Sequence, residues 1–459
     1  MKTNFLTLIL LAVCVNIHAT DLLKLNLEQA IELALSESRT IKIAEKEIER
    51  ADHARHQMQE ALFPSLNGSA QYSRAVRKQE MMLNMGGGEA PDFSAMPPPL
   101  GDIFEQMFGG MMGGGAMKVG SDNTLTFGLT ASLPLIAPGL WKSIQMSRTD
   151  LDMALERSRA SKLALVNEVK KAYYQALLAR ESYEVLQQSM KLAAQNLENV
   201  RNMFKQGMVA EYDLIRSDVY VRNMAPTLVM ARDGVALSVM MVKVLLSIPA
   251  EVNVELTDNL ALFENAVLTD KIPTVANLNR NTDLLQLDLS LQKMKQQHQL
   301  IRTQAMPTLA AFANYQYMGM GDDGVKMYFS QPFMAGFSLN VPIFNGLSRY
   351  RQSQQIKVGI EQLELQKDYF EDNLNVQARN TINQMARAKE QIASNKESVR
   401  LAEKGVEISQ IRYKTGMGTI LEMNDSDLAL VQARMNYYQS LSDYLVAKSN
   451  LENLLGNEK

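Results

Sequence analysis

Four short stretches of the chain alternate between apolar and polar side chains with a period of two residues. The clearest runs from Thr124 to Leu133, where threonine, serine or glycine separates the apolar residues. This period predicts β-strands with one apolar and one polar face. The length suits a membrane-spanning strand, which needs ~9–11 residues, but the alternation also fits a half-buried strand of a soluble sheet. The apolar or small positions are Leu66, Gly68, Ala70 and Tyr72; Leu125, Phe127, Leu129, Ala131 and Leu133; Leu309, Ala311, Ala313, Tyr315 and Tyr317; and Phe333, Ala335, Phe337, Leu339 and Val341.

Very long helical patterns follow these predicted strand hairpins. Gly139 to Gln206 and Gly346 to Thr415 contain no internal proline, and each would reach ~100 Å as one continuous helix. Apolar residues recur every three or four positions within charged surroundings, which predicts a coiled-coil-like stripe that needs a partner. Return helices are expected at Ala210 to Ser247 and Thr419 to Leu455. Pro226 should bend the first of these or mark a junction. Two shorter helices are expected before the first strand, from Leu25 to Leu35 and from Thr40 to Ala61.

The same order of elements occurs twice. Lys205-Gln206-Gly207-Met208 aligns with Lys414-Thr415-Gly416-Met417 at a spacing of 209 residues, and each pair of long helices turns at this motif. Such self-similarity indicates a duplicated architecture. We therefore divide the chain into a signal peptide at 1–19, a first repeat at 20–250, a connecting segment at 251–280 and a second repeat at 281–459.

The first residues are typical of an export signal. Lys2 precedes an apolar core from Phe5 to Val15, and Ala19 ends an acceptable cleavage site. A membrane anchor is the alternative, but the apolar run is too short to span a bilayer. Lipid attachment at Cys14 is a third interpretation. Beyond the leader no apolar run approaches ~20 residues, so we expect the mature chain to be exported and either soluble or membrane-spanning through strands.

The loop inside the first strand hairpin, about residues 77–120, is rich in methionine, glycine and proline. Its thioethers are soft ligands of the kind that bind Cu(I) or Ag(I). A flexible loop with incidental methionines is the favoured interpretation, so no metal site is predicted and the loop supplies only weak candidate ligands. These are Met81, Met82, Met85, Met111 and Met112.

Composition excludes several functional classes. The net charge is −3, which offers no basic surface for nucleic acid. The only cysteine is Cys14, so a disulfide framework is excluded. We find no Ser/His/Asp arrangement, metal cluster or phosphate-binding loop in the sequence, so we predict neither an enzyme nor a bound cofactor.

Four strands cannot close a barrel in a bilayer, because an open edge there would leave backbone groups unpaired. Closure requires several chains. Three copies would give twelve strands, which is a feasible barrel, and a matching ring of helices.

At this point the sequence resembles the TolC-like family of outer-membrane efflux channels. The resemblance rests on the leader, the opening helix, the strand ends Leu133-Pro134-Leu135 and Val341-Pro342-Ile343, and the segment Arg412 to Glu422. It implies a mainly helical fold with membrane strands: a homotrimer that combines a shared twelve-stranded outer-membrane barrel with a long periplasmic α-helical tunnel. It further implies a passive exit duct that is docked by a periplasmic adaptor protein and driven by an inner-membrane pump.

The resemblance also implies roles for residues at the two turns. Tyr413 and Asp213 match positions that form closing links, and Glu422 and Asp425 match a ring of carboxylates at the aperture, where a negative ring favours cations. The arginine that family members often carry in the second turn is replaced here by Gly418, so one closing link is expected to be missing.

Simpler explanations exist for these residues. Thr419 and Glu422 fit a capping box, and Asp213 suits the first turn of a helix through the helix dipole. Asp425 has no capping explanation.

The remaining turn residues have simpler roles. Gly207 and Gly416 should permit left-handed turns, which leaves Met208 and Met417 as exposed apolar tips for an adaptor. The alternative function is a periplasmic coiled-coil scaffold or adaptor without a pore.

Overall fold

The computed structural model describes residues 22–82, 116–323 and 326–457. The predicted leader with Cys14, and the loop methionines Met85, Met111 and Met112, lie outside these residues. The chain divides into two compact units. The helical unit comprises residues 1–54, 147–295 and 355–459, and the sheet unit comprises residues 55–146 and 296–354.

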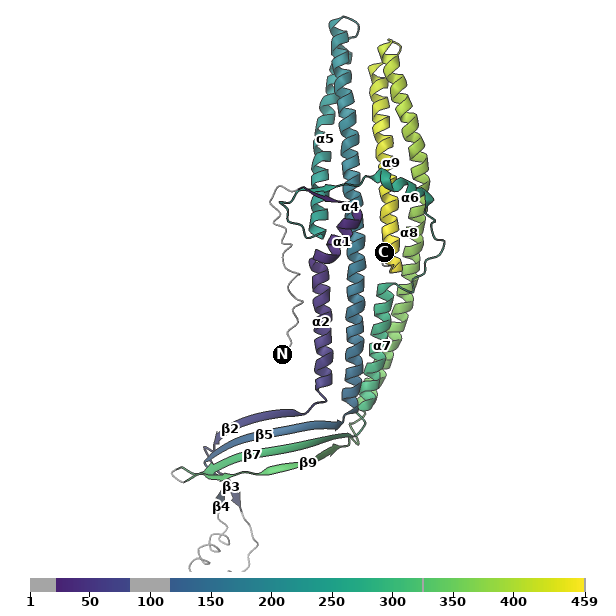
Figure 1. Cartoon of the computed structure of the whole chain (residues 1–459). Coiled ribbons are helices and arrows are strands. Elements are labelled where there is room, and N and C mark those ends of the chain that lie inside the picture. Colours follow the sequence, from purple (N-terminus) through teal and green to yellow (C-terminus); the bar gives the residue numbers. More distant parts are fainter. Residues whose placement is uncertain (1–21, 83–115, 324–325, 458–459) are drawn as a thin grey trace, which may run out of the picture. The chain divides into compact units, whose positions relative to one another are not determined.

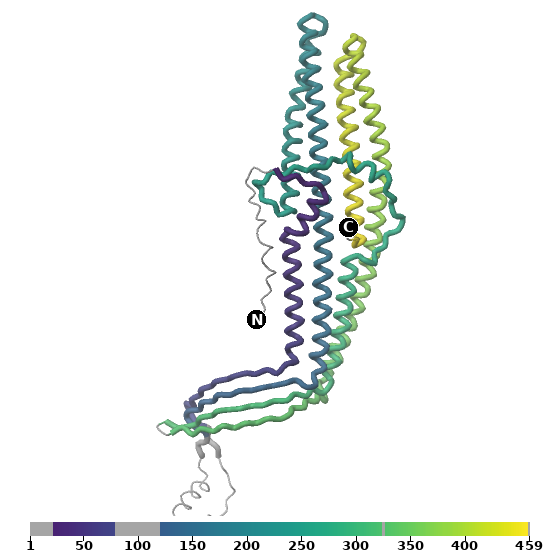
Figure 2. Tube along the Cα trace, viewed as in Figure 1, coloured from purple at the N-terminus to yellow at the C-terminus, as the bar shows by residue number. Residues whose placement is uncertain are grey.

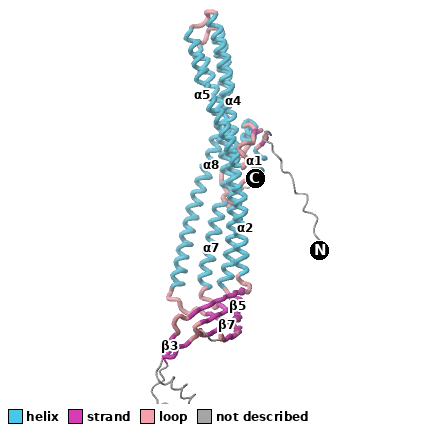
Figure 3. Tube along the Cα trace, turned by 90° about the vertical axis from the view of Figure 1, so that its left-hand side faces the viewer, coloured by secondary structure: helices cyan, strands magenta, loops and turns pink. Residues whose placement is uncertain are grey.

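The sheet unit is built on one antiparallel sheet, in which β2, β5, β7 and β9 lie side by side (Figure 1); the strands are magenta in Figure 3. A short strand, β8, pairs with the last residues of β7, so the connection between β7 and β9 is partly strand. β3 and β4 pair separately, and the backbones of Met81 and Met82 belong to β3. The bounds are β2 Ser65–Arg74, β3 Gln79–Met82, β4 Ala116–Val119, β5 Asn123–Ile136, β7 Thr308–Gly321, β8 Tyr328–Ser330 and β9 Phe333–Asn340.

The register of this sheet places the alternating apolar residues of all four long strands on one face. Leu129 of β5 lies opposite Tyr315 of β7, which lies opposite Phe333 of β9. The neighbouring polar rows, such as Asn67, Thr130 and Asn314, share the other face. The predicted strands are therefore confirmed. Phe333 is 68% exposed, so the other described residues do not cover the apolar face at this position.

The helical unit contains two long helical hairpins (Figure 1). In one hairpin α4 turns into α5, and in the other α8 turns into α9. The bounds of the helices are α1 Leu27–Glu37, α2 Arg39–Glu60, α4 Pro138–Lys205, α5 Glu211–Leu245, α6 Glu264–Thr269, α7 Thr282–Thr303, α8 Ser348–Lys414 and α9 Ile420–Leu455; some of these continue into the sheet unit.

The two unbroken long helices, α4 and α8, confirm the prediction from the proline-free stretches. Pro138 occupies the first helical position of α4, where its missing N–H costs nothing. Pro226 lies inside α5 without ending it, so of the two predicted effects, a bend or a junction, the junction does not occur. A proline removes one hydrogen bond, and the remaining bonds of a 35-residue helix keep it continuous. No helix among the described residues is long and apolar enough to cross a membrane.

The main core forms where the connecting segment passes over the helices of the helical unit (Figure 2). This segment contains β6 Val254–Leu256, a 3₁₀ turn at Leu260–Phe263 and α6. β6 pairs in parallel with β1, Leu23–Leu25. Leu260 and Val267 are buried against the inward faces of α4 and α9, where Tyr173 and Tyr444 are fully buried.

Polar contacts fasten the connecting segment to the helices around this core. The Tyr173 hydroxyl donates to the Asp258 carboxylate at 2.8 Å. The Tyr444 hydroxyl and the Lys448 ammonium both donate to Asp270, at 2.9 and 2.6 Å. Both carboxylates are partly buried, and hydroxyl and ammonium donors compensate for the water that they lose. The segment is therefore tied to both hairpins.

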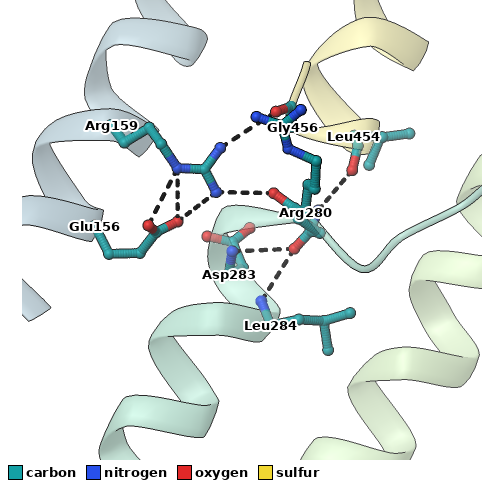
Figure 4. A network of polar contacts seen from close by, with 8 residues as sticks. Glu156, Arg159, Arg280, Asp283, Leu284, Leu454 and Gly456 are labelled. Carbon is teal, nitrogen blue, oxygen red and sulfur yellow. Dashed lines mark hydrogen bonds and ion pairs between the residues drawn. The ribbon is translucent and has the colours of Figure 1, made fainter. Parts of the chain in front are cut away.

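A second polar network joins the start of α7 to the end of α9 (Figure 4). The Arg159 guanidinium of α4 pairs with Glu156 and donates to the carbonyl oxygens of Arg280 and Gly456, at 2.8 and 3.2 Å. The buried Asn281 amide donates to the Leu454 carbonyl, and its oxygen accepts from the first N–H groups of α7. One side chain thus caps one helix and holds the end of another.

Gly456 provides a test of this network. It ends α9 with a φ of +66°, and a Cβ at this position would overlap the carbonyl oxygen of Arg280. We expect Gly456→Ala to lower the free energy of unfolding by about 1 kcal/mol or more, because both backbone strain and overlap oppose it. Thermal unfolding followed by circular dichroism measures the effect.

Gly405→Ala is the matched control. Gly405 lies inside α8 with open space around it, and alanine favours a helix, so this variant should unfold at the same or a higher temperature. If both variants lost the same stability, the effect would not come from the strain and overlap at Gly456.

Candidate functional site at the helix turns

The two hairpin turns have the same backbone geometry. Gly207 and Gly416 have φ values of +70° and +74°, the left-handed conformation expected from the sequence. In the first turn the Met208 N–H donates to the Met203 carbonyl at 2.9 Å, and in the second the Met417 N–H donates to the Arg412 carbonyl at 2.8 Å. Each helix therefore ends in a Schellman motif closed by glycine.

The methionines that follow these glycines are among the most exposed apolar side chains of the helical unit. Met208 is 68% exposed and Met417 is 70% exposed. Neither side chain belongs to the apolar cluster beneath the turns. Both turns thus present a flexible apolar side chain to their surroundings.

The helices that leave the two turns start differently. The Thr419 hydroxyl caps α9 by accepting the Glu422 N–H at 3.2 Å. Ala210 precedes α5 and provides no side-chain cap, although Glu211 and Asp213 lie in the first turn. Acidic side chains there interact favourably with the helix dipole. The second turn is therefore the better secured of the two.

Glu422 does not complete the capping box that the sequence suggested. Its carboxylate lies 3.7 Å from the Arg412 guanidinium, across the turn, and no hydrogen bond to the Thr419 N–H is found among the described residues. Arg412 also donates to the Met417 carbonyl at 3.0 Å. A Cβ at Gly418 would press on Arg412, the Tyr413 backbone and the Glu422 carboxylate. Gly418 thus leaves room for an arginine that comes from six residues earlier in the chain.

Tyr413 is buried between the two hairpins. It packs with Val200, Ile420 and Met423 in an apolar cluster to which both turns contribute. Within the described chain its hydroxyl is buried without a hydrogen-bond partner. Burial, and then the negative charge of Asp213, raise the pKa of this phenol. The two residues predicted to form a closing link are thus close enough to interact, but they are not hydrogen-bonded.

Glu422 and Asp425 both have exposed side chains on α9. They are three residues apart and so lie on similar faces of the helix. For Asp425, the described chain supplies no ion pair or hydrogen bond that would hold its carboxylate.

Asp427 is a buried carboxylate that sequence reasoning missed. It is 5% exposed and accepts hydrogen bonds from Ser189 at 2.5 Å and from Tyr220 at 3.1 Å. A signal was available, because Ile420, Met423 and Asp427 follow the helical spacing of a buried face. An acidic residue in that register is unusual.

The site as a whole offers carboxylates and hydroxyls. Among the described residues no group of three or more His, Cys, Asp or Glu side chains is placed to hold a metal ion. The predicted weak ligands Met81 and Met82 belong to the sheet unit, away from the turns in the chain.

The start of α9 allows the two roles of Glu422 to be separated. Thr419→Ala should cost about 1 kcal/mol of local stability by removing the cap, which corresponds to roughly five-fold faster hydrogen exchange over residues 420–423. Glu422→Gln should change that rate less than about two-fold, because its ion pair is long and exposed. Hydrogen exchange followed by mass spectrometry reports both. Equal acceleration in the two variants would mean that the carboxylate, and not the hydroxyl, secures the helix.

Comparison with known proteins places these features in a family. The family model described as "Outer membrane efflux protein" matches residues 30–235 and 275–457. The outer membrane protein TolC of Vibrio cholerae is 21% identical over 346 residues, covering 72% of this chain and 76% of that protein.

Solved structures share the fold at low sequence identity. The CmeC outer membrane channel of Campylobacter jejuni has a TM-score of 0.69 at 16% identity, covering 94% of this chain and 85% of CmeC. CusC, whose structures describe transmembrane channel formation, has a TM-score of 0.73 at 14% identity, covering 94% and 92%. The order of strands, long helices and turns is therefore the order seen in outer-membrane channels. The chain belongs to the outer membrane efflux protein family, whose members are outer-membrane channels with a large periplasmic portion and not enzymes.

Proposed function

We propose that the chain forms the passive exit duct of a tripartite efflux or secretion system. In this proposal three copies assemble into a homotrimer that shares a twelve-stranded barrel in the outer membrane and encloses a periplasmic helical tunnel. The duct is gated at its helix turns, is docked by a periplasmic adaptor protein and is driven by an inner-membrane pump.

The sheet supplies the observation that carries the proposal. The alternating apolar residues of its four long strands share one face, and Phe337 on that face is 74% exposed. Within the described residues, β2 pairs only with β5, and β9 pairs only with β7, so both outer edges lack a partner strand. An uncovered apolar face fits lipid, and unpaired edges in lipid require closure by further copies. A pore-free periplasmic scaffold would leave this face in water.

The helices support assembly independently. Of the 35 residues of α5, only Ser217 and Val242 are buried. An exposed stripe on α5 repeats at intervals of seven, four and three residues, and a similar stripe lies on α8. Their members are Met230, Leu237, Met241 and Val244 on α5, and Val358, Leu365, Tyr369 and Val376 on α8. This spacing is the seam of a coiled coil, and neighbouring copies in a ring would cover it.

The turns support the proposed gate. Tyr413 has a buried hydroxyl that needs an acceptor, and Asp213 is close enough to influence it. The exposed carboxylates of Glu422 and Asp425 would form rings of negative charge if three copies met around an axis. Because the apolar cluster joins the two turns, widening the entrance would require the hairpins to separate.

The exposed methionines support docking of an adaptor. Met208 and Met417 offer apolar, adaptable side chains at the two turns, and such side chains suit binding to a partner helix hairpin.

Assembly through the α5 stripe is open to a direct test. We expect Leu237→Glu to convert the detergent-extracted trimer largely to monomer, because an unpaired charge would be buried at the seam. Size-exclusion chromatography with light scattering measures the mass. Arg232→Glu introduces the same side chain at an exposed position on another face of α5 and should leave the trimer intact. If both variants remained trimers, the α5 stripe would not lie at the interface between copies.

Single-channel conductance in a planar bilayer tests the duct itself. We expect wild-type protein to show a small, cation-selective conductance, and Asp425→Ala to raise the conductance or reduce the selectivity, because one ring of charge is removed. Protein that stays soluble without detergent and never conducts would contradict the duct and favour the scaffold. Conduction that Asp425→Ala leaves unchanged would place the constriction elsewhere.

A further inference from the structure

The buried carboxylate of Asp427 connects the two helical hairpins. Asp427 is on α9 of one hairpin, whereas its donors Ser189 and Tyr220 are on α4 and α5 of the other. Asp427 and Ser189 are each 5% exposed. The site lies about two helical turns below the start of α9, beneath the apolar cluster that joins the turns.

Among the described residues, this carboxylate forms no ion pair. The guanidinium of Arg434, two turns further along α9, acts on it through its charge, but donates its hydrogen bonds to Gln188 of α4 and Glu403 of α8, each at 2.8 Å. A carboxylate removed from water loses several kcal/mol of hydration and needs strong donors in return. Asp427 obtains them from two hydroxyl groups, both of which belong to the other hairpin.

The two hydrogen bonds to Asp427 can therefore form only while the two hairpins lie together. Ser189 and Tyr220 move with the α4–α5 hairpin, and Asp427 moves with the α8–α9 hairpin. Separation would break both hydrogen bonds and expose the carboxylate to water, where it is readily hydrated. The bonds favour the joined arrangement, while the hydration of the charged group favours separation.

We propose that Asp427, Ser189 and Tyr220 form a latch that restrains separation of the two hairpins and so limits opening of the channel. This proposal rests on the proposed function as a duct. It adds a restraint about two helical turns further from the hairpin turns than the start of α9. The three residues are positioning residues, because they act on the arrangement of the helices and need not touch the transported molecule.

The latch should respond to pH. Burial raises the pKa of Asp427, although the hydrogen bonds from Ser189 and Tyr220 and the charge of Arg434 act in the opposite direction. The other ionisable groups nearby are Tyr220 itself, the exposed Asp425, and Glu403 through Arg434. A separated, hydrated Asp427 would have its ordinary pKa, so the joined arrangement binds the proton more tightly. Acidification therefore stabilises the latch, and raising the pH through the elevated pKa weakens it.

Open probability of the full-length protein in a planar bilayer tests the proposal. We expect Asp427→Ala to raise the open probability about ten-fold, the effect of losing hydrogen bonds to a charged acceptor. Asp427→Asn keeps an acceptor oxygen and should remain close to wild type at low pH. It should lose the rise in open probability that wild type shows as the pH is raised through the elevated pKa of Asp427. The exposed carboxylate of Asp443, on the same helix, gives the control variant Asp443→Ala, which should behave as wild type.

Each outcome has a distinct meaning. A conducting wild type whose open probability is unchanged in Asp427→Ala overturns the latch and leaves the duct standing, whereas a wild type that never conducts overturns the duct. If Asp427→Ala fails to assemble, Ser189→Ala and Tyr220→Phe each remove a single donor and must raise the open probability in the same direction. Wild-type behaviour of both would overturn the latch.

Discussion

Unpaired backbone at the two edges of the sheet is the constraint on which the rest of this molecule depends. The inner strands β5 and β7 are paired along both sides, but β2 and β9 each have a partner on one side among the described residues. Backbone N–H and C=O groups in lipid must be paired. The apolar face of the sheet and the exposed apolar stripes of α5 and α8 also lack a partner among the described residues, and their side chains need an apolar surface to pack against. In the proposed assembly, further copies of the chain would pair these edges and cover these faces.

Two kinds of contact hold the helical unit together, and they differ in how readily they allow motion. Asp258 and Asp270 of the connecting segment accept hydrogen bonds from tyrosine hydroxyls of the helices, beside fully buried side chains. These contacts tie both hairpins to the connecting segment. Beneath the turns the hairpins meet through the small cluster around Tyr413 and through the hydroxyl contacts of Asp427. If the channel opens as proposed, the hairpins would separate at the turns while the connecting segment keeps its place, because fewer of the described contacts join the hairpins beneath the turns.

The sequence was sufficient for features that depend on local periodicity. Strict alternation located β5 and β9, proline-free heptad-like patterns located α4 and α8, and Gly207 and Gly416 located the turns, because these are short-range backbone preferences. It was insufficient where tertiary contacts decide. Glu422 turns to Arg412 and leaves the capping box incomplete, α5 tolerates Pro226, and Asp427 is buried by residues more than 200 positions away. The roles of Asp213, Tyr413 and Asp425 in gating remain predictions.

The unequal starts of α5 and α9 have a consequence for symmetry. Both turns share one backbone geometry, yet the Thr419 hydroxyl caps the helix that leaves the second turn, whereas Ala210 leaves the first without a side-chain cap. In a ring built from several copies, hairpin turns with and without a side-chain helix cap would therefore alternate around the entrance. Duplication gives the two turns of each chain nearly the same backbone. Because a few of their side chains differ, the ring has only half the rotational symmetry that identical turns would give it. A partner that docks on such a ring would meet two chemically distinct kinds of position, and it would find the easier displacement at the α4–α5 tips.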